Sequence, residues 1–528
     1  MEEKNNWESQ GLSLLKKGQK GLFAVIFSRL GIIVLLFLLQ LFLLFAIARW
    51  FSQFLAHLYA LSIVMDIIMV PVLLNSRLDP TAQITWLMVI MIMPVFGALL
   101  YVYTCSNLGH RAMCQRVRES TEQNRRRIRQ DPAVMQRLEA ENAHAAALVR
   151  YMRRSGCHPA YDRTDVTYFP LGEDKWARML PELEKAEKFI FLEYFIIDEG
   201  LMWGRVLEIL ARKAKEGVEV RLLYDGTNEF STLPHDYPER LKKLGIQCRM
   251  FAPLTPFLST HYNYRDHRKI LVIDGHTAFN GGINLADEYI NHIRRFGHWK
   301  DTGVMLQGDA VDSFTLMFLQ MWYVNEPLCD FTPFLTAREF SPVGESRGFV
   351  MPYGDCPLDD YNVGESVYMD ILNRAHDYVY IMTPYLILDG ELEKALTFAA
   401  QRSVDVRLIL PHISDSFVAQ SLAKTYYRPL LKAGVKIYEY TPGFVHAKVF
   451  VSDDSKAVVG TINMDYRSLY HHFECATYLQ GTDCVADIKE DFLATLDKCQ
   501  EATLDTVRNE KWYVKLVGDV MKFVAPLL

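Results

Sequence analysis

The residues that decide the fold read His-Arg-Lys-Ile-Leu-Val-Ile-Asp over 267–274, followed by Gly-Gly-Ile-Asn over 281–284. A second stretch reads His-Ala-Lys-Val-Phe-Val-Ser-Asp over 446–453, followed by Gly-Thr-Ile-Asn over 460–463. In both stretches the Lys lies 2 residues after the His, the Asp 7, the Gly 14 and the Asn 17. So many matched positions, in segments that otherwise differ, indicate a duplicated structural unit.

The sequence around each stretch alternates short apolar runs with longer amphipathic ones, which is typical of strands and crossover helices in an α/β fold. In the first copy, strand, helix, strand and helix end are expected over 189–197, 201–216, 218–224 and 241–245. In the second copy, the same order is expected over 378–381, 392–401, 404–410 and 430–434. We therefore predict two duplicated halves, at 156–345 and 346–528.

Histidine and lysine side chains two residues apart on a strand project from the same face and converge on one point. Two halves packed about a pseudo-twofold axis would bring His267, Lys269, His446 and Lys448 into one cleft. There, a neutral imidazole can attack phosphorus while a protonated one gives its proton to the departing oxygen. The lysines would neutralise the charge on the phosphodiester. This chemistry requires no metal and no cofactor.

Four further polar residues are expected to support the histidines. Asn284 and Asn463 are predicted to hold the non-bridging phosphate oxygens beside the lysines. A nucleophilic histidine works best when a carboxylate holds its second nitrogen and fixes the tautomer. Glu474 and Asp301 are candidates for that role, because each follows the histidine of its own half in a segment with strand character.

The motif aspartates, Asp274 and Asp453, are counted with the catalytic residues. Their position at strand ends nevertheless favours a structural salt bridge over direct proton transfer. Three other histidines, His261, His471 and His472, are interpreted as neighbours of the site at most. The sequence contains no His-Glu-x-x-His, no P-loop and no carboxylate cluster at the spacing of metal ligands.

Residues 1–104 are predicted to anchor the chain in a membrane. The segment 30–48 has Gln40 as its one polar side chain and is long enough to cross a hydrocarbon layer of about 30 Å. Two more spans are predicted near 54–74 and 84–103. Because Asp66 interrupts the second run, a buried or re-entrant hairpin arm remains an alternative there.

A basic helical linker is predicted over 105–155. The arginines that follow the last predicted span are Arg111, Arg116, Arg118, Arg125, Arg126, Arg127 and Arg129. By the positive-inside rule they place the large domain at the cytoplasmic face of the cell membrane. Lys16, Lys17, Lys20 and Arg29 before the first span give the opposite signal for three crossings, and we follow the denser arginine cluster. The cluster would also attract anionic head groups.

The net charge and the cysteine spacing indicate which partners and cross-links the chain is expected to lack. The formal net charge is −6, and an acidic chain gains nothing from the counterion release that drives binding to nucleic acid, so no nucleic-acid partner is expected. The nine cysteines show no paired spacing, which favours reduced thiols over disulfides or a zinc site.

The doubled His-x-Lys pattern, with Asp five residues beyond each Lys, resembles that of the phospholipase D superfamily. The resemblance implies α/β/α sandwich halves and a phosphohistidine intermediate, with His267 as the nucleophile and His446 as the acid. Other segments resemble the bacterial cardiolipin synthase branch, namely Leu78-Asp79-Pro80, Asn263-Tyr264-Arg265 and Trp299-Lys300-Asp301. The departures are an additional predicted span and Asp266, where Asn is expected before the histidine.

This resemblance implies a phosphatidyltransferase that converts two phosphatidylglycerol molecules into cardiolipin and glycerol. The motifs leave open a phospholipase D hydrolase, or a transferase that uses another alcohol. An inactive membrane scaffold that binds anionic lipid is a further alternative, which the two intact motifs disfavour. Oligomeric state stays open.

Overall fold

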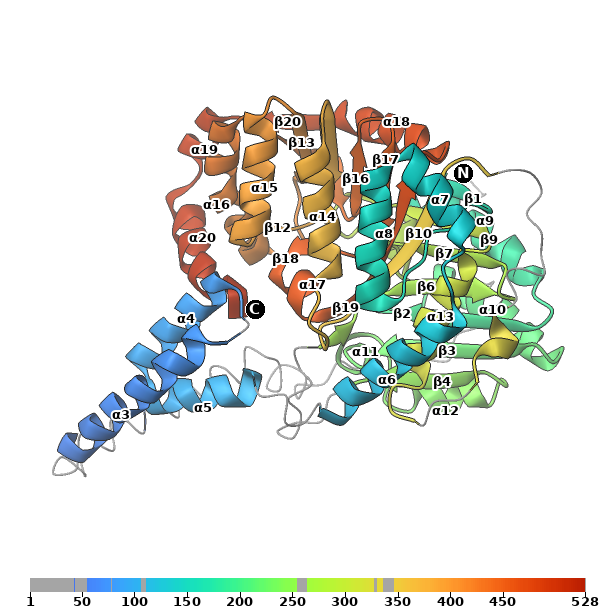
Figure 1. Cartoon of the computed structure of the whole chain (residues 1–528). Coiled ribbons are helices and arrows are strands. Elements are labelled where there is room, and N and C mark those ends of the chain that lie inside the picture. Colours follow the sequence, from blue (N-terminus) through green and yellow to red (C-terminus); the bar gives the residue numbers. More distant parts are fainter. Residues whose placement is uncertain are drawn as a thin grey trace, which may run out of the picture. The chain divides into compact units, whose positions relative to one another are not determined.

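The computed structural model describes residue 42 and residues 55–76, 78–105, 111–253, 264–326, 330–335 and 346–527. Two sheets form the centre of the larger of two compact units (Figure 1). The first is seven-stranded, in the order β1-β9-β7-β6-β2-β3-β4. In chain order its strands are β1 (Thr164–Phe169), β2 (Phe189–Tyr194), β3 (Glu219–Asp225), β4 (Gln247–Phe251), β6 (Lys269–Ile273), β7 (Thr277–Gly281) and β9 (Gly303–Gly308).

The second sheet repeats this plan in the order β10-β19-β17-β16-β11-β13-β14 and adds β20 at its end. Its strands are β10 (Phe349–Asp355), β11 (Tyr378–Met382), β13 (Asp405–Pro411), β14 (Lys436–Tyr440), β16 (Val449–Ser452), β17 (Lys456–Gly460), β19 (His472–Gln480) and β20 (Cys499–Ala502). In each sheet the strand after the motif histidine runs antiparallel to its inner neighbour, β6 to β2 and β16 to β11. The predicted duplication is confirmed.

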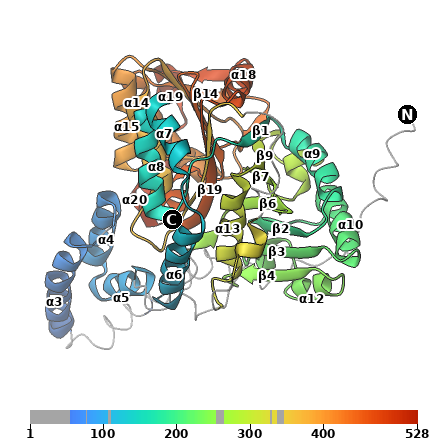
Figure 2. The same cartoon turned by 45° about the vertical axis from the view of Figure 1, so that its right-hand side comes forward.

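Helices cover the outer face of each sheet, and two more lie between the sheets. The first half has α9 (Gly172–Glu184), α10 (Leu201–Lys215), α11 (Asn228–Ser231), α12 (Tyr237–Lys242) and α13 (Val311–Trp322). The second has α14 (Val363–Arg374), α15 (Gly390–Gln401), α16 (Phe417–Ala433), α17 (Tyr466–Tyr470), α18 (Cys484–Leu496), α19 (Leu504–Asn509) and α20 (Trp512–Val524). Figure 2 shows α9 and α10 beside one sheet and α14 and α15 beside the other.

A single apolar core joins the halves. It combines inward-facing residues of both sheets, such as Phe191 and Val272 from the first and Val451 and Val459 from the second, with α13 and α18. The strands after the motif histidines are buried on both faces, as their continuous apolar runs predict. The two sheets therefore hold the motif residues on one rigid body.

The predicted linker is helical, with α6 (Arg111–Arg127), α7 (Pro132–Glu141) and α8 (Ala143–Gly156). Its later helices belong to the globular part, because Val134, Leu138 and Val149 are buried in the core that α14 and β10 also form. Part of the predicted linker therefore packs on the second half, although the first half follows it in the sequence.

The described N-terminal residues form a separate small unit with three helices, α3 (Leu55–Leu74), α4 (Pro80–Ile92) and α5 (Pro94–Cys105). Its apolar contacts are made by Met69, Leu73, Trp86, Ile90 and Ala98. Among the described residues, no helix has both the length and the apolar character needed to cross a bilayer.

The three predicted membrane spans compare differently with the described helices. The span near 30–48 lies outside the described residues, and the one near 54–74 corresponds to the helix α3. The single span predicted near 84–103 is wrong, because α4 ends before Met93 and α5 begins at Pro94. A Cβ on Gly97 would lie 2.9 Å from the Ile90 main chain, so the two short helices fold back closely on each other.

Candidate active site

Each motif histidine is placed by a strand that crosses to the other half. In the first half, β5 (Arg265–Asp266) pairs with the beginning of β19 rather than with its own sheet. The backbone N–H of His267 then donates to the carbonyl oxygen of Phe473 at 2.9 Å. His267 is therefore fixed by the backbone of the second half.

The second half repeats this crossing in the opposite direction. The strand β15 (Gly443–Val445) pairs with β8 (His298–Lys300) of the first half. The backbone N–H of His446 donates to the carbonyl oxygen of Lys300 at 2.7 Å. The two crossings relate the histidines by the expected pseudo-twofold symmetry.

A buried carboxylate faces the inner nitrogen of each imidazole. The Nδ1 atom of His267 lies 2.9 Å from Oε1 of Glu474, and Nδ1 of His446 lies 2.6 Å from Oδ2 of Asp301. With the proton of each ring held on Nδ1, Nε2 keeps its lone pair for chemistry. The predicted carboxylates are the right residues, but their expected pairing is wrong, because each serves the histidine of the other half.

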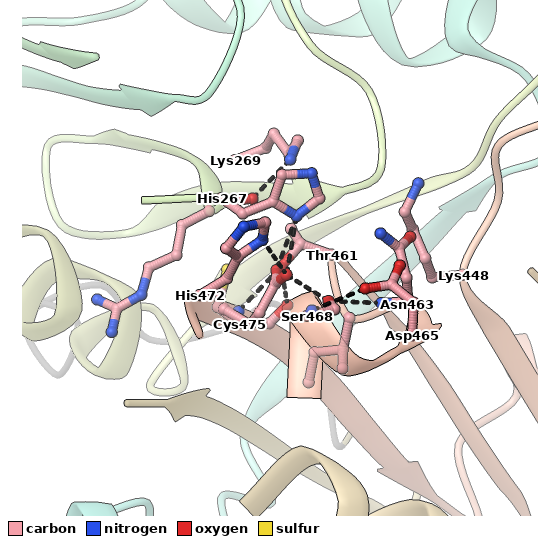
Figure 3. Close-up of polar contacts among 12 residues, drawn as sticks. His267, Lys269, Lys448, Thr461, Asn463, Asp465, Ser468, His472 and Cys475 are labelled. Atoms are coloured by element: carbon pink, nitrogen blue, oxygen red, sulfur yellow. Dashed lines mark hydrogen bonds and ion pairs between the residues drawn. The ribbon is translucent and has the colours of Figure 1, made fainter. Parts of the chain in front are cut away.

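Hydroxyl groups hold the carboxylate of Glu474 in turn. Ser468 and Thr461 both donate to it, and Figure 3 shows these contacts together with the neighbouring His267 and His472. Asp301 is held by the backbone N–H of Thr302 at 2.8 Å. Burial would raise the pKa of Asp301, but His446 and Lys448 lower it below the ordinary value, so this carboxylate is charged.

The motif lysines lie beside the rings and are almost fully buried. Lys269 donates to the carbonyl oxygen of His267 at 2.5 Å, and Lys448 donates to that of His446. Burial lowers the pKa of Lys269 to about 8 and that of Lys448 to about 7. An anion bound between them would favour their charged forms.

The four motif groups are close enough to act on one another electrostatically. Burial lowers the pKa of His267 well below its ordinary value, and Lys269, Lys448 and His446 lower it further. Burial lowers the pKa of His446 to about 4, and Lys269 from the first half contributes. Both imidazoles and both ammonium groups thus lie within electrostatic range of one another.

Aromatic side chains surround both imidazoles. The rings of Trp299, Tyr289 and Phe444 lie 5.3, 5.5 and 5.8 Å from the His446 ring, centroid to centroid. Phe195 lies 4.8 Å from the His267 ring. The two buried imidazoles are therefore lined by aromatic side chains, three beside His446 and one beside His267.

The two motif asparagines differ in what they contact. Asn284 accepts from the backbone N–H of Ile196 at 2.9 Å and donates to the Tyr289 hydroxyl at 2.8 Å. Its oxygen and one of its two amide N–H groups are thus used within the protein, where they support Tyr289, and a contact of the second N–H with phosphate stays a prediction. The Oδ1 atom of Asn463 has no hydrogen-bond partner among the described residues. A role for Asn463 toward phosphate stays a prediction.

The motif aspartates lie at the far ends of their strands, roughly 20 Å of extended chain from the histidines. Asp274 accepts three consecutive backbone N–H groups, from Glu187 to Phe189. Asp453 does the same from His376 to Tyr378. The prediction that counted them with the catalytic residues is corrected to a structural role, because their carboxylates fix the turn that enters the neighbouring strand. The salt bridge expected at a strand end is represented by the 3.9 Å contact of Asp453 with Lys456.

Two further residues lie in the site, His472, which the sequence placed as a neighbour at most, and Lys175, which it did not single out. His472 is buried, its ring centroid lies 5.2 Å from that of His267, and its Nδ1 lies 3.6 Å from Oε1 of Glu474. Lys175, in α9, is buried near Asp301, with its pKa lowered by burial to about 8. The repeat could not reveal either residue, because neither has a counterpart at a matching offset.

One cluster in the described part of the chain has the composition of a metal site. His267, His472 and Glu474 offer ligand atoms that all lie within 4.8 Å of one another. The ammonium groups of Lys269 and Lys448 lower the pKa of His267, and the same repulsion between like charges disfavours a cation beside that ring. We therefore assign the cluster to phosphate chemistry.

The geometry agrees with a known family. Residues 179–322 and 368–496 match the family model described as "Cardiolipin synthase, PLD-like domain". The chain belongs to this family. A protein of Streptococcus mutans described as uncharacterized is 58% identical over 456 residues, which are 86% of this chain and 98% of that protein. Cardiolipin synthase 2 of Bacillus anthracis is 33% identical over 459 residues, 87% of this chain and 88% of that one.

A solved structure supports the fold independently. Phosphatidylserine synthase of Haemophilus influenzae is similar with a TM-score of 0.56 over 73% of this chain and 98% of that one. At 11% sequence identity this likeness shows the fold alone.

Proposed function

We propose that this chain is a cardiolipin synthase that transfers the phosphatidyl group of one phosphatidylglycerol to a hydroxyl of a second, with release of glycerol. The observation that carries the proposal is the site itself, where each half supplies a histidine and lysine and the other half supplies the carboxylate behind that histidine. Family membership supports the choice of cardiolipin as the product.

In the first step, Nε2 of His267 attacks phosphorus, and the bond from phosphorus to the glycerol oxygen breaks. His446 gives the departing oxygen its proton. The pKa of His446 is about 4 in the empty site, and a bound phosphodiester anion raises the pKa of a nearby histidine. The charged lysines neutralise the negative charge that grows on the non-bridging oxygens.

In the second step, a hydroxyl of the second phosphatidylglycerol attacks the phosphohistidine. His446, now neutral, takes the proton of that hydroxyl, and the phosphorus–nitrogen bond breaks to release cardiolipin. The Glu474 carboxylate stabilises the imidazolium character that His267 acquires when phosphorylated. His267 is the preferred nucleophile by family resemblance.

The surroundings of the site favour transfer over hydrolysis. Water and an alcohol compete for the same phosphohistidine, so a transferase must keep water away. The wall of Trp299, Tyr289 and Phe444 beside His446 serves this purpose. The wall is the specific observation against a simple phospholipase D.

The substrates are membrane lipids, so we propose that the N-terminal region attaches the enzyme to the cell membrane with its catalytic part at the cytoplasmic face. The apolar segment 30–48 is the strongest candidate for a span. In α3, Ile67 and Leu74 expose two-thirds of their surface, which suits contact with lipid. Phosphatidylglycerol and other anionic phospholipids are the expected partners.

The test uses the purified full chain in detergent with phosphatidylglycerol labelled in its head group in one reaction and in its acyl chains in a second. We expect equal amounts of free labelled glycerol and cardiolipin. Phosphatidic acid without cardiolipin would identify a hydrolase, and incorporation of another added alcohol would identify a different transferase. Turnover unchanged in both His267→Ala and His446→Ala would identify a scaffold.

The nucleophile is identified by a reaction with a donor labelled in its phosphatidyl group. The reaction is stopped without acid, so that the phosphohistidine survives, and the labelled peptide is isolated. The phosphate is expected on the peptide that contains His267. Its recovery on the His446 peptide would reverse the two roles without affecting the proposed reaction.

A further inference from the structure

The helix α20 presents a stripe of exposed apolar side chains at the surface of the catalytic domain. Trp512, Leu516 and Val520 are 73%, 53% and 57% exposed, respectively. Their spacing of four residues places them along one face of the helix. Tyr513 and Phe523 flank the stripe and are also exposed. Several large apolar side chains in one exposed row indicate a contact surface rather than ordinary surface variation.

The opposite face of α20 is fixed against α16, so the stripe has one orientation. Val514 and Gly518 are buried on that face. A Cβ on Gly518 would lie 2.4 Å from the carbonyl oxygen of Ser421, which shows that the two helix backbones are in close contact there. Lys522 lies over the Tyr426 ring at 4.2 Å. Figure 1 shows the two helices side by side.

The apolar surface continues onto the beginning of α16. Phe417 and Val418 are exposed at its first turn, and Ile413 is exposed in the preceding loop. The Phe417 and Tyr513 rings lie 6.3 Å apart, which joins the two parts of the surface. We name Ile413, Phe417, Val418, Trp512, Tyr513, Leu516 and Val520 the α20 surface.

The charges around this surface identify its occupant. Lys511 precedes the first turn of α20 and Lys515 lies within it, whereas Lys522 is turned toward Tyr426; Asp519 is the one acidic residue of the helix. A helix with tryptophan and aliphatic residues on one side and lysines beside them is typical of elements that lie in the interface of an anionic bilayer. A protein partner would not require both apolar side chains and lysines. In an anionic bilayer, lipid tails contact the apolar side chains and head groups contact the lysines.

We propose that the α20 surface inserts into the head-group region of a bilayer that contains anionic phospholipid. This inference rests on the proposed function only in that the substrate is a bilayer lipid. A membrane anchor alone holds the domain near the bilayer but leaves its orientation free. Insertion of α20 fixes which face of the catalytic domain meets the lipid and so raises the rate at which lipids enter the site.

The direct test is fluorescence of the full chain in vesicles of phosphatidylglycerol and phosphatidylcholine brominated on the acyl chains. The difference between the emission of the unmodified protein and of Trp512→Phe isolates Trp512 from the other tryptophans. We expect this component to be quenched by the brominated lipid and protected from acrylamide. Quenching by acrylamide alone would place Trp512 in water, and protection from both would place it against protein; either result overturns the proposal.

The functional test replaces Trp512, Leu516 and Val520 with Glu together. We expect kcat/KM on vesicle lipid to fall roughly tenfold, since the apolar area that enters the interface is lost. Turnover of a short-chain phosphatidylglycerol below its micelle concentration should stay unchanged, which excludes unfolding. The matched control is Phe398→Glu on α15, where an exposed phenylalanine stands apart from the α20 surface; it should alter neither rate.

The two tests separate the proposals. If the unmodified chain produces no cardiolipin, the proposed function fails, while the quenching of Trp512 still decides the membrane contact. If cardiolipin forms but the triple variant matches the Phe398→Glu control on vesicles, the membrane contact fails alone.

Discussion

The Nδ1 atom of His267 lies 2.9 Å from Oε1 of Glu474, a residue 207 positions further along the chain and in the other half of the duplication. The equivalent contact joins His446 to Asp301 at 2.6 Å. Neither half therefore contains a complete catalytic histidine. A duplicated fold with this arrangement can only act when both halves are packed together, which gives a physical reason for the large shared core between the sheets.

This arrangement predicts the effect of Glu474→Gln. The amide keeps the size of the side chain but no longer stabilises an imidazolium or fixes the proton on Nδ1. We expect kcat for cardiolipin formation to fall by about 10²–10⁴-fold with little change in KM, as for other orienting carboxylates. Asp301→Asn should show a loss in the same range, measured with labelled phosphatidylglycerol.

The control for the carboxylate experiment is the double variant His267→Ala with Glu474→Gln. Because the two residues act as one unit, the double variant should be no slower than His267→Ala alone. A fall of less than about threefold in the Glu474→Gln single variant would show that this carboxylate does not orient the histidine.

Asp453→Asn tests the structural role of the motif aspartates. An amide oxygen is a weaker acceptor for the three backbone N–H groups, so we expect a loss of about 1–3 kcal/mol in unfolding free energy. The rate constant kcat at low temperature should stay within about twofold, because the carboxylate lies far from the histidines. His446→Ala should show the opposite pattern, with activity lost and stability retained.

The pH dependence of that loss provides a second check. Burial alone would raise the pKa of Asp453, but the backbone amides lower it below the ordinary value. Its stabilising contribution is therefore complete above the unfolded pKa of about 4 and disappears as pH falls through the lower folded value. The Tm difference between the protein and Asp453→Asn should shrink in acid; a difference that is constant down to pH 2 would contradict this account.

The spacing of the sequence predicted which residues form the site and that the apolar runs after them are interior. The repeat of the same offsets around His446 predicted the symmetry. The expected reason was different in detail: His267 and Lys269 were expected on one face of a strand, but β6 begins only at Lys269. In the second half β16 begins only at Val449, so the motif histidines lie just before these strands.

What the sequence could not show depends on contacts between segments far apart in the chain. The pairing of β5 with β19 is made by backbone groups that every residue possesses, so the side chains in the sequence do not predict it. That pairing decides which carboxylate meets His267 and brings His472 beside it. The break at Pro94 was missed for another reason. Hydropathy counts apolar residues and does not show whether a proline interrupts a helix, as Pro94 does, or lies within one, as Pro71 does in α3.

The lysines predict how activity depends on pH. In the empty site burial lowers the pKa of Lys448 to about 7 and that of Lys269 to about 8. Both lysines must be protonated to neutralise the phosphodiester, so kcat/KM should fall as pH rises from 7 to 9. The rate constant kcat should fall at higher pH, because the bound anion raises the pKa of both lysines.

Lys448→Arg distinguishes the lysine from other groups that titrate in this range. Guanidinium stays charged throughout, so the alkaline fall in kcat/KM should move upward by about one pH unit or more, even if the longer side chain reduces the maximum rate. An alkaline limb identical to that of the unmodified enzyme would assign the fall to a different group.

The aromatic wall predicts the ratio of the two possible products. In Trp299→Leu, space opens beside His446, and water gains access to the phosphohistidine. We expect the fraction of phosphatidic acid to rise several-fold at the expense of cardiolipin, while total consumption of phosphatidylglycerol changes less. Thin-layer separation of the two labelled lipids measures the ratio in one reaction.

Trp203→Leu is the matched control for this experiment. Trp203 is a fully buried tryptophan in the core of the first half, where its Nε1 donates to the Tyr237 hydroxyl at 2.7 Å, so its loss also removes a buried indole. Its substitution should lower Tm and leave the product ratio unchanged. If both variants shift the ratio equally, loosened packing rather than the wall admits water; if neither does, exclusion of water depends on groups other than Trp299.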